Sequence, residues 1–306
     1  MLLRPLLLTD LPHAIALLRA ACEFDSADIV AEEKLFGAAP HTEGVQSIAA
    51  FHHAQLVGVA AIDGNRIRVL AVAPAARDHG IGTALLTWCE QHARGAGHPR
   101  IWALGQAGNY LAPGIDTRNQ PTINWLHRRG WQATSDIRTN LIVATHNNPQ
   151  VSPVRVRALA DDAATRGYQI RRARHDETRL LEAIAAEFGG AWPFEVERAL
   201  HWQSNDLAVG VGVHVATRGD DYCAFAAHNG NNTGLGWFGP AGTWPAHRGH
   251  RLGQAVLIAC LLDVAADHRT CEIAWIGPEP FYQKSCGIVG RRTFVAMKRE
   301  FTEDKH

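Results

Sequence analysis

The chain has 306 residues, of which 46% are apolar and 20% are charged. This composition is typical of a soluble globular protein of two domains and excludes a disordered or fibrous chain. The 30 basic side chains balance the 30 acidic ones, so no broad positive field is expected to attract nucleic acid or a membrane surface. A small polar or charged substrate fits this balance better.

The start of the chain is apolar enough to resemble a signal peptide, but Arg4, Pro5, Asp10 and Pro12 interrupt the run. We expect a strand and a helix there, and a cleaved leader is the less favoured alternative. The six cysteines include no Cys-x-x-Cys pair, which predicts buried free thiols in the reducing cytoplasm. The histidine pairs 52–53 and 247/250 lack the partner spacing of a zinc site, so no metal is expected.

One short segment occurs twice. Residues 72–86 read VAPAARDHGIGTALL, and residues 243–257 read TWPAHRGHRLGQAVL. A proline, an arginine and a glycine recur at one constant offset: Pro74, Arg77 and Gly82, then Pro245, Arg248 and Gly253. We interpret the chain as one duplicated domain, because a single repeat of this length is not a solenoid.

Each half predicts the same order of elements. In the first half we expect strands near 2–8, 45–51, 56–62, 67–72, 101–104 and 137–144, with helices over 10–21, 81–95 and 122–129. In the second we expect strands over 169–173, 208–217, 222–228, 235–243, 272–276 and 292–298, with helices over 176–187 and 252–267 and a last helix in the segment PEPFYQKSCG. Strand, helix and strand around the repeated segment predict a right-handed parallel crossover in an otherwise antiparallel sheet. The expected domains are 1–146 and 168–306, joined by a linker over 147–167 with a short helix near 158–165.

The repeated segment predicts an anion site. A strand that runs through Arg-x-x-Gly-x-Gly into a helix leaves backbone N–H groups unpaired at the helix start, and the helix dipole adds positive potential there. Gly80 and Gly82 allow phosphate oxygens close to the backbone, Thr83 offers a hydroxyl, and Arg77 can close over the charge. The expected ligand is a diphosphate. A Walker loop and a Rossmann fingerprint both require different spacings.

These residues resemble the signature of the GNAT superfamily of N-acetyltransferases, Val-x-Pro-x-x-Arg/Gln-x-x-Gly-x-Gly/Ala. Every position of the signature is matched by Val72, Pro74, Arg77, Gly80 and Gly82. The resemblance covers nearly the whole chain as two tandem GNAT domains. It implies an α/β (α+β) fold in which each domain is a mixed, mostly antiparallel sheet with a central parallel crossover and flanking helices.

The resemblance also implies a cofactor, acetyl-coenzyme A (acetyl-CoA). Its pyrophosphate would lie on the repeated turn, its pantetheine arm along the preceding strand, and its thioester where the fourth and fifth strands splay. The cofactor-binding residues implied are Leu70, Val72, Arg77, Asp78, His79, Gly80, Ile81, Gly82 and Thr83 in the first copy, and Thr243, Arg248, Gly249, His250, Arg251, Leu252, Gly253 and Gln254 in the second. Arg251 replaces Gly80, which costs energy if the position needs a positive φ and otherwise adds a cation.

The last helix differs between the copies. Phe281 and Tyr282 precede Gly287 in a segment that resembles the family's Phe-Tyr-x-x-x-Gly, with one extra residue. By this resemblance Tyr282 is the acid that protonates the leaving coenzyme A thiolate, and the alternative is a core aromatic residue. The first copy has Leu126 at this place. The first half therefore keeps the better phosphate turn and the second keeps the better acid.

The implied reaction is direct attack of a primary amine, of a small molecule or a peptide, on the acetyl thioester. Glu187, Glu279 and His228 are candidate bases, although each is also explained as an ordinary surface or structural residue. The segment 108–124 is either a loop over the acceptor cleft or a surface insertion.

Two alternatives stay open. The chain could bind coenzyme A without turnover, as a sensor or structural module, which Arg251, Leu126 and the missing base favour. Alternatively, one half is catalytic and the other is degenerate. Because GNAT domains often pair, we expect a monomer that imitates a dimer, or a weak homodimer.

Overall fold

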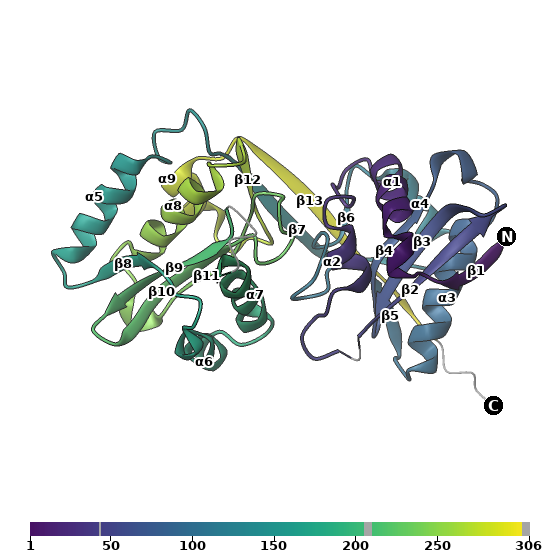
Figure 1. Cartoon of the computed structure of the whole chain (residues 1–306), viewed down its shortest axis with the longest axis horizontal. Helices are drawn as coiled ribbons and strands as arrows, with labels where there is room; N and C mark the ends of the chain where they lie inside the picture. The colour runs from purple at the N-terminus through teal and green to yellow at the C-terminus, as the bar shows by residue number, and fades with distance from the viewer. Residues whose placement is uncertain (43, 205–209, 302–306) are drawn as a thin grey trace. The chain divides into compact units, whose positions relative to one another are not determined.

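The computed structural model describes residues 1–42, 44–204 and 210–301. The chain forms two compact units (Figure 1). Unit 1 comprises residues 1–138 together with the chain from Thr293 onward, and unit 2 comprises residues 139–292. Strands β7 (Gln132–Ala144) and β13 (Gly290–Glu300) each pass from one unit into the other.

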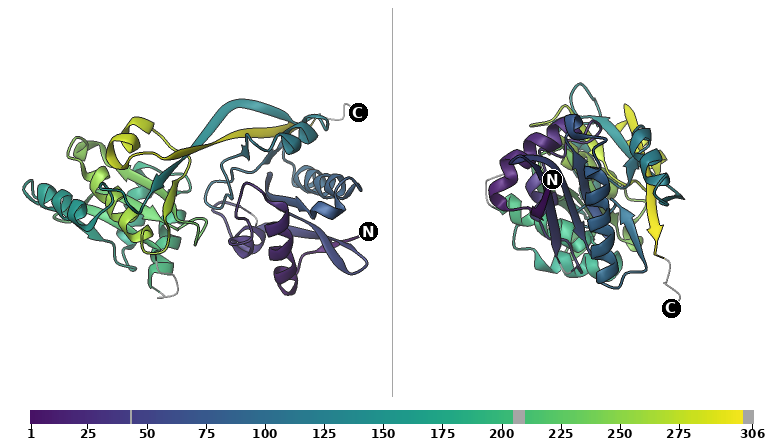
Figure 2. Two further views of the ribbon diagram at one scale, coloured as in Figure 1. Left: turned by 90° about the horizontal axis from the view of Figure 1, so that it is seen from above. Right: turned by 90° about the vertical axis from the view of Figure 1, so that its right-hand side faces the viewer.

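The sheet of unit 1 has the strand order β1-β2-β3-β4-β5-β13, and β6 pairs with β13. The β4–β5 pair is parallel, and the other pairs in this order are antiparallel. Helices α1 and α2 lie on one face of the sheet, and α3 lies on the other (Figure 2). The elements before the crossing are β1 (Leu2–Pro5), α1 (Leu11–Ala21), α2 (Ala31–Phe36), β2 (Val45–His52), β3 (Gln55–Asp63), β4 (Arg66–Val72), α3 (Ile81–Gly95), β5 (Arg100–Ala103), β6 (Ile115–Asp116) and α4 (Gln120–His127), with 3-10 turns η1 (Leu8–Asp10) and η2 (Pro74–Ala76).

The sheet of unit 2 has the order β7-β12-β11-β10-β9-β8, in which β11–β12 is the parallel pair. Helices α6 and α7 cover one face, and α8 and α9 cover the other (Figure 1). The elements are α5 (Pro153–Ala164), β8 (Gln169–Arg172), α6 (Thr178–Glu187), α7 (Trp192–Ser204), β9 (Gly212–Arg218), β10 (Asp221–His228), β11 (Trp237–Thr243), η3 (Pro245–His247), α8 (Leu252–Val264), β12 (Thr270–Ile273) and α9 (Glu279–Cys286).

Strand β10 is buried on both faces because helices cover both sides of the sheet. Ala224 and Ala226 belong to the cluster around α8, while Phe225 and Ala227 belong to the cluster around α6 and α7. This alternation is the two-residue period of a strand. Helix α8 is buried without interruption from Ala255 to Leu261, because α5 packs on the side that the sheet leaves uncovered. Its sequence is therefore apolar all round rather than amphipathic.

The last strand of each half pairs in the sheet of the other unit. Residues 141–144 of β7 pair antiparallel with residues 270–273 of β12, and residues 297–300 of β13 pair antiparallel with residues 100–103 of β5. Phe294 and Met297 of β13 are fully buried within unit 1. The domains expected from the sequence, 1–146 and 168–306, place β7 with the first half and β13 with the second, so they do not include this exchange of strands.

Most of the elements expected from the sequence are present, and the differences are local. Helices α2 and α7 and the short strand β6 were not expected. The helix in the linker range is longer than expected, since α5 covers Pro153–Ala164. The expected strand 208–217 begins at Gly212 in the structure, and its positions 208 and 209 lie outside the described residues.

The first part of the segment 108–124 is not a surface insertion, because residues 108–116 are all buried. Asn109 anchors it by donating hydrogen bonds to the carbonyl oxygens of Glu33, at 3.0 Å, and Ala38, at 2.8 Å. Among the described residues, none of the helices combines the length and the apolar composition needed to cross a bilayer.

Because β13 completes the sheet of unit 1, a substitution on this strand is expected to lower the stability of unit 1. Met297→Ala is expected to cost about 2–5 kcal/mol by leaving a cavity in the core of unit 1, whereas Met297→Leu keeps the volume and is expected to cost less than about 1.5 kcal/mol. Hydrogen exchange measured by mass spectrometry should show faster exchange in β2–β4, while α8 keeps its protection. Faster exchange in α8 and unchanged β2–β4 would contradict the assignment of β13 to unit 1.

Candidate active site: two equivalent turns, a splayed sheet and a pocket

The two copies of the repeated segment have the same backbone conformation. In unit 1 the chain leaves β4, forms η2 and enters α3, and φ is +64° at Asp78 and +79° at Gly80. In unit 2 it leaves β11, forms η3 and enters α8, and φ is +81° at Gly249 and +59° at Arg251. Left-handed residues therefore occur at the same two places in both turns.

Arg251 thus occupies a position that requires a positive φ. A non-glycine residue in this conformation costs roughly 1–2 kcal/mol. Local contacts offset part of this cost: Nε of Arg251 donates to Oε1 of Gln254 at 3.1 Å, and its guanidinium lies 3.6 Å from Oδ2 of Asp162. The side chain is therefore held at the start of α8, next to the turn.

Both turns present a row of unpaired donors. Within the described part of the chain, the backbone N–H groups of residues 78–83 and 249–254 donate to no protein acceptor. A Cβ atom added at Gly80 or Gly249 would meet nothing within 4 Å, so both turns face open space. Unpaired N–H groups at the positive end of a helix fit the oxygens of a diphosphate.

The arginine of each turn has an equivalent position. Nε of Arg77 donates to the carbonyl oxygen of Val72 at 3.4 Å, and Nε of Arg248 donates to that of Thr243 at 3.3 Å. Each guanidinium is thereby fixed beside the end of the strand that leads into the turn. Both arginines are exposed, so each can pair with an anion bound there.

The sheet opens next to each turn. In unit 1 the β4–β5 ladder consists of Arg66 with Trp102 and Ile67 with Ala103, and among the described residues no strand pairs with the rest of β4 on that side. In unit 2 the β11–β12 ladder stops in the same way at Phe238 with Ile273. A register shift lies beside each opening, between β3 and β4 and between β10 and β11, as bulges often do next to active sites. The open edges carry Leu70, Val72 and Thr243.

The helices after the fifth strand contact the start of the turn helix in both units. A Cβ atom at Gly82 would lie 3.4 Å from the ring of Trp125 on α4, and one at Gly253 would lie 3.8 Å from the ring of Phe281 on α9. Trp125 and Phe281 are therefore equivalent, and so are the residues that follow them. This agrees with the pairing of Leu126 and Tyr282 expected from the sequence.

Leu126 and Tyr282 differ in chemistry. Leu126 is buried in the core of unit 1, whereas Tyr282 is partly exposed and packs against the cluster around α8. Burial raises the pKa of Tyr282 to about 12 because the ionised phenolate is disfavoured away from water. Its phenol is therefore protonated at neutral pH and can donate a proton.

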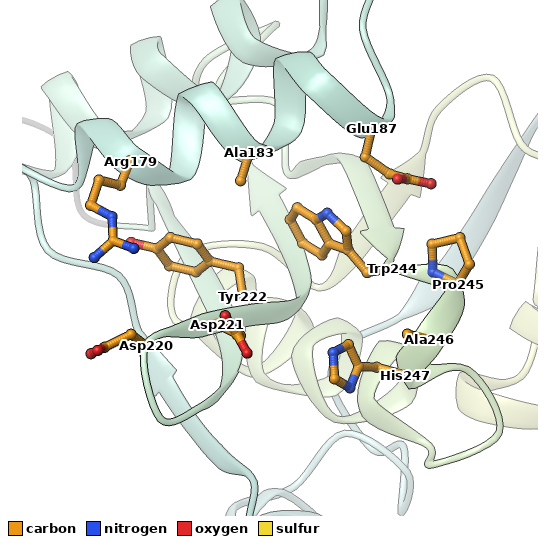
Figure 3. A pocket seen from close by; sticks show the side chains of 10 residues that line it. All are labelled: Arg179, Ala183, Glu187, Asp220, Asp221, Tyr222, Trp244, Pro245, Ala246 and His247. Carbon is orange, nitrogen blue, oxygen red and sulfur yellow. The ribbon is translucent and has the colours of Figure 1, made fainter.

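A pocket of about 500 Å³ in unit 2 adjoins the second turn (Figure 3). It lies between α6, the β9–β10 hairpin and η3. Glu187 and Trp244 are on one side of it, and Tyr222 and Arg179 are on the other. The lining residues are Arg179, Ala183, Glu187, Asp220, Asp221, Tyr222, Trp244, Pro245, Ala246 and His247. Neither Trp244 nor Tyr222 was predicted from the sequence, although Trp244 lies directly before the repeated proline.

The three candidate bases lie in different surroundings. Glu187 borders the pocket. Glu279 is paired with Arg291, whose hydrogen bond lowers the pKa of Glu279 and makes it a weaker base. His228 is fully buried at the end of β10 and does not line this pocket. Of the three, Glu187 is best placed to receive a proton from a molecule in the pocket.

Residues 14–130 match the model of the acetyltransferase (GNAT) family. Over 99% of both chains, the structure is similar to a tandem GNAT protein from the clavulanic acid biosynthesis pathway, with a TM-score of 0.72 and 17% identity. A GCN5-related N-acetyltransferase from Sphaerobacter thermophilus has a TM-score of 0.66 and 16% identity over 98% of this chain and 95% of that one.

A third similar structure is that of a fungal multi-domain GH3 β-N-acetylglucosaminidase with a GCN5-related glucosamine N-acetyltransferase region. Its TM-score is 0.73 at 16% identity, and the match covers 97% of this chain and 38% of that one. No curated protein matches the sequence of the chain. The first half therefore contains a GNAT family domain, and the whole chain has the fold of two GNAT domains in tandem.

The left-handed conformation of Gly80 at the start of α3 can be tested by a pair of glycine substitutions. Gly80→Ala is expected to destabilise the protein by about 1 kcal/mol, because alanine is strained at this φ. Gly95→Ala, in the last turn of the same helix and with open space around it, is expected to stabilise it by about 0.5–1 kcal/mol. Urea unfolding measures both. Equal effects of the same sign would contradict the conformation assigned to the turn.

Proposed function

We propose that the protein is an N-acetyltransferase that moves an acetyl group from acetyl-CoA to a primary amine, and that the chemistry takes place in unit 2. One observation carries this proposal: a turn with unpaired N–H groups lies beside an open strand edge, and Tyr282, a protonated acid, is on the helix that contacts the turn. Unit 1 has an equivalent turn and opening but has Leu126 in place of the acid.

The residues proposed to hold acetyl-CoA are Leu70, Val72 and residues 77–83 in unit 1, and Thr243 and residues 248–254 in unit 2. The N–H groups and the two arginines bind the pyrophosphate. The open edges of β4 and β11 offer backbone groups to the amides of the pantetheine arm. When bound, acetyl-CoA supplies an acyl thioester that an amine can attack directly.

The pocket of unit 2 is the proposed site of the acceptor. Its carboxylates, Glu187, Asp220 and Asp221, attract a cationic amine, and the faces of Tyr222 and Trp244 suit the same charge. Glu187 takes a proton from the ammonium group so that the amine is neutral when it attacks, and Tyr282 gives its phenolic proton to the departing sulfur. The acceptor is therefore a small molecule or a peptide end with a positive charge.

Unit 1 supports a second role. Its turn retains both glycines and the arginine of the family signature, but Leu126 has no proton to give. We propose that unit 1 binds coenzyme A without turnover, so that the chain combines one catalytic half and one binding half.

Calorimetric titration with acetyl-CoA tests which turn binds. The wild type is expected to bind two molecules per chain. Arg77→Ala and Arg248→Ala should each weaken one of the two sites by roughly 10–100-fold, because each loses a charge-assisted hydrogen bond to phosphate. Arg128→Ala, which removes an exposed arginine outside the turns, should leave both sites unchanged. Unaltered binding in the Arg77 and Arg248 variants would exclude these turns as the phosphate sites.

Steady-state kinetics with a panel of amines tests the acid. Tyr282→Phe is expected to lower kcat by about 10²–10⁴-fold without changing the affinity for acetyl-CoA, whereas Tyr110→Phe, in unit 1, should leave kcat unchanged. In the wild type, kcat should not fall on the alkaline side up to about pH 10, where an ordinary phenol titrates, because the pKa of Tyr282 is about 12.

Two results would redirect the proposal. Full turnover in Tyr282→Phe would remove this residue from the mechanism. Thermal stabilisation of the wild type by coenzyme A together with no turnover on any amine would favour a binding module in both halves. Glu187→Gln, measured in parallel at neutral pH, should lower kcat/KM if Glu187 is the base, because the glutamine amide cannot take the proton of the ammonium group.

A further inference from the structure

A second group of reactive side chains lies in unit 2, outside the turn and the pocket. It consists of His214 on β9, His228 at the end of β10, and Cys260 and Asp263 on α8. One ligand atom each from His214, His228 and Cys260 lie within 4.8 Å of one another. Cys260 is eight positions after the first residue of α8, or about 12 Å along the helix, so this cluster is distinct from the anion site at the helix start. We call it the His-Cys-Asp cluster.

The strands and the helix bring these four residues together by their regular spacing. His214 lies opposite Ala226 in the β9–β10 ladder, and His228 follows Ala226 by two positions, so both imidazoles are on the face of the sheet that packs against α8. Cys260 and Asp263 are three residues apart and share one face of α8. The cluster is therefore part of the rigid interface between sheet and helix.

His228 has a nitrogen without a hydrogen-bond partner. Its Nδ1 lies 2.6 Å from the carbonyl oxygen of Gly210, and since a carbonyl only accepts, Nδ1 carries the proton. Nε2 therefore has a lone pair directed into the cluster. This atom is buried and, among the described residues, makes no hydrogen bond, although Oδ2 of Asp263 is 3.3 Å away.

One carboxylate, Asp263, lies beside His228, and it is also paired with Arg172. Oδ2 of Asp263 accepts from Nε2 of His214 at 2.8 Å and from Arg172 at 2.7 Å. A lone pair thus faces a carboxylate oxygen, and a cation between them would remove the repulsion.

We propose that the His-Cys-Asp cluster binds one divalent transition-metal ion of the zinc type, with His214, His228, Cys260 and Asp263 as its four ligands. Two neutral imidazoles, a thiolate and a carboxylate are a donor set that zinc prefers, and the two anionic ligands balance the charge of the ion. Ligand atoms on one tetrahedral ion lie roughly 3.3–3.8 Å apart, so those of His214, His228 and Cys260, which lie within 4.8 Å of one another, need to move by about 1 Å.

Binding is balanced by proton movements within the cluster. The Sγ of Cys260, which donates to the carbonyl oxygen of Ala226 at 3.4 Å, loses its proton to solvent and binds as thiolate. Nε2 of His214 gives up the proton that it donates to Asp263 and Nδ1 takes one up from solvent, so the imidazole stays neutral, binds the ion through Nε2, and its hydrogen bond to Asp263 is replaced by the shared ion. The side chain of Asp263 is 24% exposed, which leaves a path for the ion to enter. The metal would join β9 and β10 to α8.

The test uses the full chain, first treated with a chelator and then titrated with Co²⁺ and Zn²⁺. We expect one ion per chain, a thiolate-to-cobalt charge-transfer band together with the intense visible bands of tetrahedral Co²⁺, and loss of both when Zn²⁺ displaces it. Zn²⁺ at about 100 times its Kd should raise the Tm by about 5–10 °C. If the wild type gives no thiolate band, or no saturable binding, the cluster is an ion-paired polar core around Arg172 and the proposal is wrong.

Variants locate the site. Cys260→Ala and His228→Gln are expected to lose the cobalt bands and the Tm shift. Cys223→Ala, which removes another fully buried thiol of the same unit, should retain both. Unchanged stoichiometry in His228→Gln and Cys260→Ala would assign the ion to other histidines of the chain and overturn the proposal. Because the spectrum of the wild type alone decides whether a thiolate is a ligand, the test stands even if one variant does not fold.

Discussion

The structure depends on a constraint at the start of two helices: the first backbone N–H groups of a helix have no partner within it. In α3 and α8 the chain does not cap these groups with side chains. Left-handed residues shape both turns, and in the described part of the chain six successive N–H groups of each turn have no protein acceptor. The adjoining strand then leaves its neighbour, so that an unpaired edge and unpaired donors meet. An extended molecule with a phosphate end can satisfy both at once.

The two units meet this constraint with different residues. Unit 1 has glycine at the second left-handed position, and unit 2 has Arg251 there at an energetic cost that its contacts to Gln254 and Asp162 offset only in part. Unit 2, in turn, has Tyr282 where unit 1 has Leu126. A strained residue is retained in the copy that also has Tyr282 and the pocket. The division of labour that we propose for the halves rests on these substitutions.

Residues that act through local backbone geometry could be predicted from the sequence. The repeated turn, the helices that follow it and the equivalence of Leu126 and Tyr282 all follow from short-range patterns. Trp244 and Tyr222 could not be assigned to a pocket, because they meet only when β10, β11 and α6 are packed. The His-Cys-Asp cluster could not be predicted for the same reason. Its residues are spread over 50 positions, from 214 to 263, without the close spacing that marks a zinc motif. Helix α7, with aromatic and β-branched residues among its first positions, lacks a clear apolar stripe.

Local sequence patterns also do not indicate which strands pair with each other. Residues 137–144 and 292–298 have the alternation of ordinary strands, and nothing in them states that β7 pairs with β12 or that β13 pairs with β5. A half of this protein, taken alone, would carry a strand that belongs elsewhere and would lack the strand that completes its own sheet. Only a second copy of that half could supply it. The chain therefore resembles a domain-swapped homodimer whose two copies are joined covalently. If its halves were produced as separate chains, we would expect the product to be stable only as a pair.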